Sequence, residues 1–312
     1  MISVIICTYN RPNDIGRVVK SVLSNTYPDY ELLIIDQSNT DETKKIVEKC
    51  ITKNSHLKYL WSVRGKSRAV NLGVKEAEGD IIAFTDDDCV VSEDWLEKIA
   101  ITLDRITTDS IIVFGSVKPA EHDVRRGFIP ANKIRYAEFK GPLSIKKVGT
   151  GGIMQANMVV RKNFFEKVGY FDEVLGPGGE LKAALEYDIV YRALKKGFKI
   201  IHVPTIEVEH HGFRTWEEGK LLFERYIIGT VGTFCKHIRC MDFNAVLLLL
   251  ILIPFDLVVY TNNIISLKFS LLDSLYLLVL IYRIYLISFL KGIIKSMKFN
   301  VDKRNMVYLR EK

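Results

Sequence analysis

The chain of 312 residues is long enough to bury one large hydrophobic core or two ordinary ones. Its formal net charge is +7, and residues 291–312 hold seven basic side chains against two acidic ones, so most of the excess lies in this tail. The nearly balanced remainder argues against an extended nucleic-acid surface and favours contact between the basic tail and anionic membrane lipids. Five scattered cysteines indicate a reducing compartment, and the first residues do not resemble a secretory signal peptide.

Short runs of β-branched residues alternate with helix-length segments along the first 120 residues. These runs predict strands at residues 2–8, 30–36, 57–61, 80–85 and 110–117. In the first spacer, Ile15, Val18, Val19 and Val22 recur at intervals of three and four, which is typical of a helix. The alternation predicts an α/β fold with a mostly parallel, Rossmann-like sheet that has helices on both faces.

Polar side chains follow four of the predicted strands. They are Thr8, Tyr9 and Asn10 after the first strand, Asp36 after the second, residues 64–71 after the third, and Asp86, Asp87 and Asp88 after the fourth. Ligands of parallel sheets bind at the carboxyl ends of the strands, so all of these residues belong to one edge. Three neighbouring carboxylates resist full ionisation unless a cation or hydrogen-bond donors neutralise them. A positive partner is therefore expected beside the aspartates.

Each of these groups also has an ordinary structural explanation. Asp36 could cap a turn before a helix that starts near Thr40. The segment 65–73 could be a basic loop that enters a helix, and the aspartates could form a polar turn before a helix capped by Ser92. The joint placement at one edge is what favours a binding site.

The combination of side chains matches the parts of a nucleoside diphosphate. An aromatic ring can stack on the base, an acidic residue can bind the ribose, and carboxylates can hold Mg²⁺ or Mn²⁺ together with the phosphates. Such a metal also neutralises the charge that develops on a departing diphosphate. The sequence therefore predicts a metal-dependent nucleotide site at this edge.

The sequence resembles the bacterial family 2 type glycosyltransferases, which have the GT-A fold of nucleotide-diphospho-sugar transferases. The resemblance covers roughly residues 1–240, and it rests on six segments in the family's order: VIICTYNRP, IIDQSNTDET, GKSRAVNLGVKEAEGDIIAFTDDDC, VGYFDEVLGPGGE, LEYDIVYRALKKG and VEHHGFRTW. It implies an inverting transferase that moves a sugar from a UDP, GDP or dTDP type donor to a hydroxyl of a polyprenyl-linked or polysaccharide acceptor in surface glycan synthesis. Mn²⁺ or Mg²⁺ would be the cofactor.

The resemblance also assigns roles on the donor side. The implied donor-binding residues are Thr8, Tyr9, Asp36, Arg68, Asn71, Asp86 and Asp87. The implied metal ligands are Asp86, Asp88 and His210, with Asp88 the direct ligand, and an imidazole suits Mn²⁺ better than Mg²⁺. Gln37 stands where the family often has a second acidic residue, so the base of the nucleotide stays unassigned.

The second half of the chain would hold the acceptor and a general base. Counting back from Arg192 places Glu186 on the family's catalytic acidic residue and Asp188 on its later aspartate, while Leu185 replaces the first acidic residue. A base here needs a pKa raised toward neutrality by burial. The alternative is that acidic residues are simply favoured at a helix N-terminus. The residues expected on the acceptor side are Asn157, Phe171, Asp172 and Glu180, of which Glu180 is also a third candidate base.

After about residue 240 the composition becomes apolar. Residues 244–260 and 271–290 approach the roughly 20 residues that cross a bilayer, although charged residues and Pro254 interrupt them. They could form a two-span helical hairpin with both flanks cytoplasmic, or a pair that lies in one leaflet. We therefore expect a catalytic domain at 1–240, with a donor half at 1–118 and an acceptor half at 119–240. Residues 241–312 would associate with the cytoplasmic face of a bacterial inner membrane.

Three other classes of protein are less well supported. A dinucleotide-dependent oxidoreductase should have G-x-G-x-x-G after its first strand, where this chain has TYNRP. A sugar-nucleotide pyrophosphorylase should begin with a glycine-rich basic loop. A sugar-nucleotide-binding membrane protein without transferase activity would need neither the aspartates nor Glu186, and binding of UDP or GDP with Mn²⁺ would separate it from a transferase.

Overall fold

The computed structural model describes residues 1–51, 56–149, 152–251 and 271–310. The chain divides into two compact units. Unit 1 comprises Met1–Glu173 and Glu186–Gly219, and unit 2 comprises Val174–Leu185 and Lys220–Lys312. The domain division expected at residue 240 stays a prediction.

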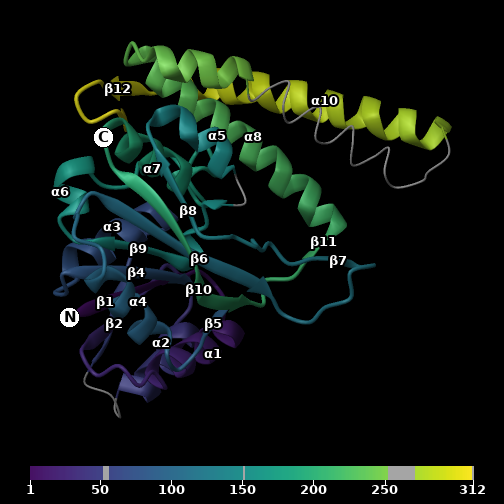
Figure 1. Ribbon diagram of the computed structural model, residues 1–312. Coiled ribbons are helices and arrows are strands. Elements are labelled where there is room, and N and C mark those ends of the chain that lie inside the picture. Colours follow the sequence, from purple (N-terminus) through teal and green to yellow (C-terminus); the bar gives the residue numbers. More distant parts are fainter. Residues whose placement is uncertain (52–55, 150–151, 252–270, 311–312) are drawn as a thin grey trace. The chain divides into compact units, whose positions relative to one another are not determined.

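Unit 1 is built on one mixed sheet whose described strands lie in the order β3-β2-β1-β4-β9-β6-β10-β5, with β8 also paired to β10 (Figure 1). Its strands are β1 (Ile2–Thr8), β2 (Tyr30–Asp36), β3 (Leu57–Trp61), β4 (Ile81–Asp86), β5 (Cys89–Val91), β6 (Ile111–Pro119), β8 (Ala137–Lys140), β9 (Met158–Arg161) and β10 (Lys199–His210). Strands β5, β8 and β9 run antiparallel to their neighbours, and the others run parallel. The five strands expected from the sequence are β1, β2, β3, β4 and β6, so the prediction of a mostly parallel α/β sheet is confirmed.

Helices cover both faces of this sheet because its strands are apolar on both sides. In β1, Ile2, Val4 and Ile6 share a core with residues of α1 (Pro12–Leu23). Ile5 faces the opposite way, toward Gly73 of α3 (Lys66–Glu76), where a side-chain carbon would lie 2.7 Å from Ile5 Cγ2. Each buried Ile or Val contributes roughly 1.5–3 kcal/mol, so both layers stabilise the sheet.

The remaining elements connect and flank this framework. The helices are α2 (Glu42–Ile51), α4 (Trp95–Asp104), α5 (Ile145–Val148), α6 (Phe164–Val168), α7 (Leu185–Lys195), α8 (Trp216–Arg239) and α10 (Leu271–Ser296), with 3-10 turns η1 (Pro142–Ser144) and η3 (Gln155–Asn157). Strand β7 (Gly127–Phe128) pairs with β11 (Arg214–Thr215), and β12 (Asn300–Asp302) pairs with β13 (Val307–Leu309).

The carboxyl ends of the parallel strands form the edge that the sequence predicted. Thr8, Asp36 and Asp86 end β1, β2 and β4. Strand β10 runs parallel to β6, so its last residue, His210, lies on the same edge. No strand was predicted over residues 199–210, where Pro204 interrupts the pattern and the pairing shifts register between Val203 and Glu207.

Unit 2 contains most of the apolar sequence that suggested membrane spans. Tyr285 of α10 packs with Ile227 and Val231 of α8 in a small core, so part of the apolar signal comes from packing inside this unit. Within the described residues, no helix has the length and apolar character needed to span a bilayer. This finding contradicts the predicted two-span arrangement at the cytoplasmic face of the inner membrane. No observation in the described residues shows an association with the membrane. The predicted hydrophobic helical hairpin is likewise not supported, and residues 252–260 of its first segment lie outside the described residues.

Candidate active site

Two basic side chains neutralise the three aspartates that follow β4. Arg11 Nη1 donates hydrogen bonds to Asp87 Oδ1 at 2.7 Å and to Asp88 Oδ2 at 2.5 Å. Lys66 Nζ donates to Asp86 Oδ1 at 2.6 Å. The expected positive partner is therefore present, but neither Arg11 nor Lys66 was among the predicted site residues. The available signal was their position, since Arg11 directly follows Thr8, Tyr9 and Asn10, and Lys66 lies within residues 64–71.

The aspartates differ in protonation because their surroundings differ. Burial raises the pKa of Asp87 to about 6; the Arg11 charge offsets part of this rise and the Asp88 charge adds to it. Burial would also raise the pKa of Asp88, but the hydrogen bond and charge of His210, together with Arg11, hold it well below its ordinary value. Asp88 thus stays ionised at pH values where Asp87 begins to take up a proton.

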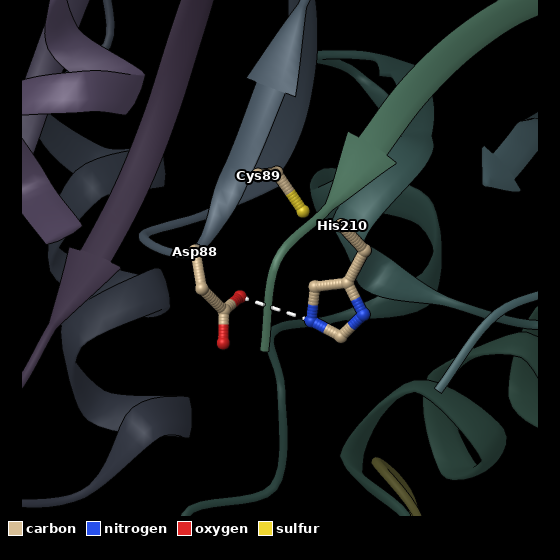
Figure 2. A group of neighbouring side chains, drawn as sticks. All are labelled: Asp88, Cys89 and His210. Carbon is tan, nitrogen blue, oxygen red and sulfur yellow. Dashed lines mark hydrogen bonds and ion pairs between the residues drawn. The ribbon is translucent and has the colours of Figure 1, made fainter. Parts of the chain in front are cut away.

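Strand pairing brings His210 to Asp88. His210 lies opposite Cys89 in the antiparallel pairing of β10 with β5, and the backbone N–H of His211 donates to the Asp88 carbonyl at 2.7 Å. Figure 2 shows the Asp88 carboxylate turned toward the His210 ring, where Oδ1 lies 3.1 Å from Nε2. His210 Nδ1 lies 2.6 Å from the Pro130 carbonyl, so Nδ1 donates there and Nε2 faces the carboxylate. Burial lowers the pKa of His210, but the Asp88 interaction outweighs it and the net shift is upward.

The chemistry of this corner fits a divalent cation. The donor atoms of Asp88, Cys89 and His210 lie within 4.8 Å of one another. Gly212 keeps the space beside them open, because a side-chain carbon there would lie 2.4 Å from Asp88 Oδ2 and 2.7 Å from His210 Nε2. A carboxylate suits Mn²⁺ or Mg²⁺, and an imidazole is a common ligand of divalent transition metals. Burial raises the pKa of the Cys89 thiol well above its ordinary value, so Cys89 stays a protonated, soft group that hard cations avoid.

Two of the three predicted metal ligands therefore come together. Asp88 and His210 meet, whereas the Asp86 carboxylate binds Lys66. Cys89 joins the cluster although the sequence did not single it out. Its only signal was its position directly after the aspartates.

The predicted nucleoside side contains Thr8, Tyr9 and Asp36 at the ends of β1 and β2. The Asp36 carboxylate accepts hydrogen bonds from the Ser38 N–H at 2.8 Å and from Tyr59 Oη at 2.9 Å. It therefore caps the turn after β2, as the ordinary explanation held, and its role toward a ribose stays a prediction. The Arg64 guanidinium lies 4.6 Å from the centre of the Tyr9 ring, and Thr8 is buried.

Arg68 and Asn71 connect the predicted donor side to the predicted acceptor side. Arg68 Nε donates to Glu173 Oε2 at 3.1 Å. The Asn71 amide binds both backbone groups of Phe171, with two hydrogen bonds of 2.9 Å. Phe171 itself is buried, and its ring lies 6.0 Å from that of Phe84. Helix α3 is thus fastened to the segment around Phe171, while a nucleotide contact of Arg68 or Asn71 stays a prediction.

The other residues expected on the acceptor side have different surroundings. Asn157 is fully buried, and its amide hydrogen-bonds to the carbonyls of Ser116 and Ile206 and accepts from Trp95 Nε1. Asp172 is buried. Glu180 belongs to unit 2, where Arg310 binds both of its carboxylate oxygens at 2.9 Å.

The two candidate bases lie in the first turn of α7 but differ in environment. Glu186 is half-buried, and burial raises its pKa; the Lys66 charge opposes this rise and the Asp86 charge adds to it. Because Lys66 also binds Asp86, it links Glu186 electrostatically to the aspartates. Asp188 is fully buried and pairs with Arg192 Nε at 2.9 Å. Glu186 thus combines partial exposure with a raised pKa, and its role as the general base stays a prediction.

A mostly parallel sheet with acidic residues and a histidine at its carboxyl edge is the arrangement expected of the GT-A fold. The family model for glycosyl transferase family 2 matches residues 3–169, more than half of the chain. The chain belongs to this family.

Curated relatives and solved structures agree with this family. Glycosyltransferase AglE of Haloferax volcanii is 31% identical over 185 residues, which are 58% of this chain and 59% of AglE. The S. aureus TarS fragment 1–349 in complex with UDP-GlcNAc superposes with a TM-score of 0.55 at 20% identity, over 75% of this chain and 66% of that one. GalNAc-T7 with UDP, GalNAc and Mn²⁺ superposes with a TM-score of 0.51 at 19% identity, over 68% of this chain and 44% of that one. The matches to AglE and to both structures thus span less than two thirds of those proteins.

Proposed function

We propose that this chain is an inverting glycosyltransferase that moves a sugar from a nucleotide-diphosphate sugar to a hydroxyl group of a glycan or polyprenyl-linked acceptor. The observation that carries this proposal is the connection between Glu186 and the aspartates through Lys66. It supports Glu186 as a base that would act near the groups that would hold the leaving diphosphate.

The donor would bind along the carboxyl edge of the sheet. Tyr9 would stack on the base, and Asp36 would meet the ribose. Asp88 and His210 would hold Mn²⁺ or Mg²⁺, which supplies positive charge for the departing diphosphate. The GalNAc-T7 structure with UDP and Mn²⁺ and the TarS structure with UDP-GlcNAc support a divalent metal and a nucleotide-sugar donor, which we expect to be of the UDP, GDP or dTDP type.

Glu186 would act on the acceptor. Its carboxylate accepts the proton of the acceptor hydroxyl while that oxygen attacks the anomeric carbon of the donor sugar. The bond between the anomeric carbon and the phosphate oxygen breaks, and the nucleoside diphosphate leaves from the opposite side. The configuration at the anomeric carbon is thereby inverted.

The test is a thermal-shift screen of the full chain with UDP, GDP and dTDP, each with and without Mn²⁺. We expect one nucleotide to raise the melting temperature only when Mn²⁺ is present, because a ligand at 100 times its Kd adds about 2.7 kcal/mol of stability. Asp88→Asn should lose this shift. A shift that needs no metal, or one that persists in Asp88→Asn, would contradict the proposed donor site.

A further inference from the structure

Gln155 in η3 is a buried polar side chain whose amide makes no hydrogen bond within the described residues. It is 3% exposed. Neither its amide nitrogen nor its amide oxygen has a hydrogen-bond partner in the described part of the chain. Burial of an amide without partners destabilises a folded protein, so a residue kept in this state needs a reason outside the fold.

Asn157, two residues further along η3, shows the opposite arrangement. Its amide nitrogen donates to Ser116 O and Ile206 O at 2.9 Å each, and its oxygen accepts from Trp95 Nε1 at 3.2 Å. Asn157 is therefore the amide that connects η3 to the neighbouring elements through hydrogen bonds. Gln155 is free to act on something else.

The strand register brings Gln155 to the edge where the aspartates lie. Strand β9 pairs antiparallel with β4, and Met158 lies opposite Phe84. Residues that precede Met158 therefore run past the carboxyl end of β4, toward Asp86 and Asp87. In agreement with this register, η3 contacts β4, β6 and β10.

The order of strands indicates which part of a ligand would reach this position. Along β2-β1-β4-β9, the edge carries first Asp36, then Tyr9, then the aspartates, and then Gln155. In the proposed function, the first positions meet the nucleoside and the aspartates meet the diphosphate. The next group of a nucleotide sugar is its sugar.

We propose that Gln155 binds the transferred sugar, with its amide N–H donating to one sugar hydroxyl and its amide oxygen accepting from another. This inference rests on the proposed function, because only a nucleotide-sugar donor places a sugar next to the diphosphate. It makes Gln155 a residue that recognises the donor sugar.

The test compares binding of matched ligand pairs, UDP with UDP-GlcNAc and GDP with GDP-mannose, to the full chain in the presence of Mn²⁺. Gln155→Met keeps the size of the side chain and removes the amide. We expect it to weaken binding of the nucleotide sugar by about tenfold, the loss typical of one or two hydrogen bonds, while affinity for the nucleotide alone stays within about twofold. Gln155→Asn, which keeps the amide but shortens its reach, should also weaken binding of the nucleotide sugar.

Thermal stability provides the control. Gln155→Met should keep or raise the melting temperature, because it removes a buried amide without partners, whereas Asn157→Leu should lower it. A fall in the melting temperature of Gln155→Met as large as that of Asn157→Leu would overturn the proposal. Equal losses of affinity for the nucleotide and for the nucleotide sugar in Gln155→Met would also overturn it. Unchanged donor affinity with a raised acceptor KM would also overturn it, because Gln155 would then contact the acceptor. If the parent chain binds neither these four ligands nor dTDP and dTDP-glucose, the proposed function itself fails.

Discussion

Asp88 is the side chain on which the candidate metal site depends. It contacts Arg11 and His210, and Arg214 Nη2 lies 3.7 Å from its carboxylate. Asp88→Asn keeps the shape of the side chain and removes its charge. We expect Mn²⁺-dependent nucleotide affinity to fall by roughly 100-fold. Loss of a direct metal ligand should reduce affinity at least as much as loss of a group that only holds such a ligand in place.

Asp87→Asn is the matched control for this prediction. Asp87 pairs with Arg11 but not with His210, and its raised pKa makes it a weaker source of negative charge than Asp88 near pH 6. Its replacement should therefore reduce affinity less than Asp88→Asn does. Calorimetric titration with the nucleotide and Mn²⁺ measures the affinity of both variants. Parental affinity in Asp88→Asn would show that Asp88 is not a metal ligand.

The pH profile of transfer tests the link between Lys66 and Glu186. A general base must be ionised, so transfer should fall as the pH drops through the raised pKa of Glu186, above the ordinary value of 4.5. The Lys66 charge lowers this pKa. Lys66→Met should therefore move the acidic limb of kcat/KM to higher pH.

Lys58→Met provides the control for this profile, because Lys58 pairs with Glu31 and Glu78. Its removal should leave the acidic limb in place. An unshifted limb in Lys66→Met would show that the titrating base is a different group.

At the scale of elements, α7 is fastened to the chain before it by one buried guanidinium. Arg192 pairs with Asp188 and donates to Val168 O at 2.9 Å and to Tyr170 O at 2.8 Å. Arg192→Met would leave the Asp188 charge buried without this partner. We expect a loss of about 3–5 kcal/mol in the free energy of unfolding, measured with urea.

The double variant Asp188→Leu, Arg192→Met tests the physical reason for that loss. It removes both charges, so part of the stability should return. A loss under about 1 kcal/mol in the single variant, well below the usual cost of breaking a buried ion pair, would contradict the structural importance of the pair.

The elements that the sequence predicted are those with a strong local pattern. Strands β1 to β4 and β6 are short runs rich in apolar residues, and their order along the chain sufficed to predict the edge where Asp36 and Asp88 lie. Strand β9 pairs only four residues with β4, and β10 is interrupted at Pro204, so neither had a clear local signal.

The partners of the site residues depended on distant contacts. Asp88 meets His210 only because β10 pairs with β5. The choice of Arg11 and Lys66 as partners of the aspartates depends on where side chains of neighbouring loops reach. The same holds for the Asn71 amide, which binds Phe171, a hundred residues away in the sequence. None of these distances is encoded in local periodicity.

At the scale of the whole molecule, the C-terminal residues complete unit 2. Tyr308 Oη donates to Gly232 O at 2.5 Å, and Arg310 pairs with Glu180. Gly292 of α10 packs closely on Val231 of α8, where a side-chain carbon would lie 2.9 Å from Val231 Cβ. Deletion of residues 241–312 would expose these surfaces of α8 and of residues 174–185.

We expect this deletion to lower the melting temperature by about 5 °C or more, since each kcal/mol lost shifts a protein of this size by roughly 2–4 °C. Nucleotide-dependent stabilisation should persist in any folded fraction, because Asp88 and His210 belong to unit 1. Differential scanning calorimetry of the two chains provides the comparison. An unchanged melting temperature would show that unit 2 is stable without its C-terminal part.

The central claim is that Glu186 is the general base of sugar transfer and that donor binding does not depend on it. The direct test is the effect of Glu186→Gln on donor binding and on transfer. Calorimetry with the donor nucleotide sugar and Mn²⁺ should give parental affinity, while turnover falls by about 10² to 10⁴. Glu180→Gln, in unit 2, should change turnover far less, and Asp188→Asn serves as the comparison within α7. Near-parental turnover in Glu186→Gln, with collapse in Asp188→Asn, would contradict the claim and move the base two residues along the helix.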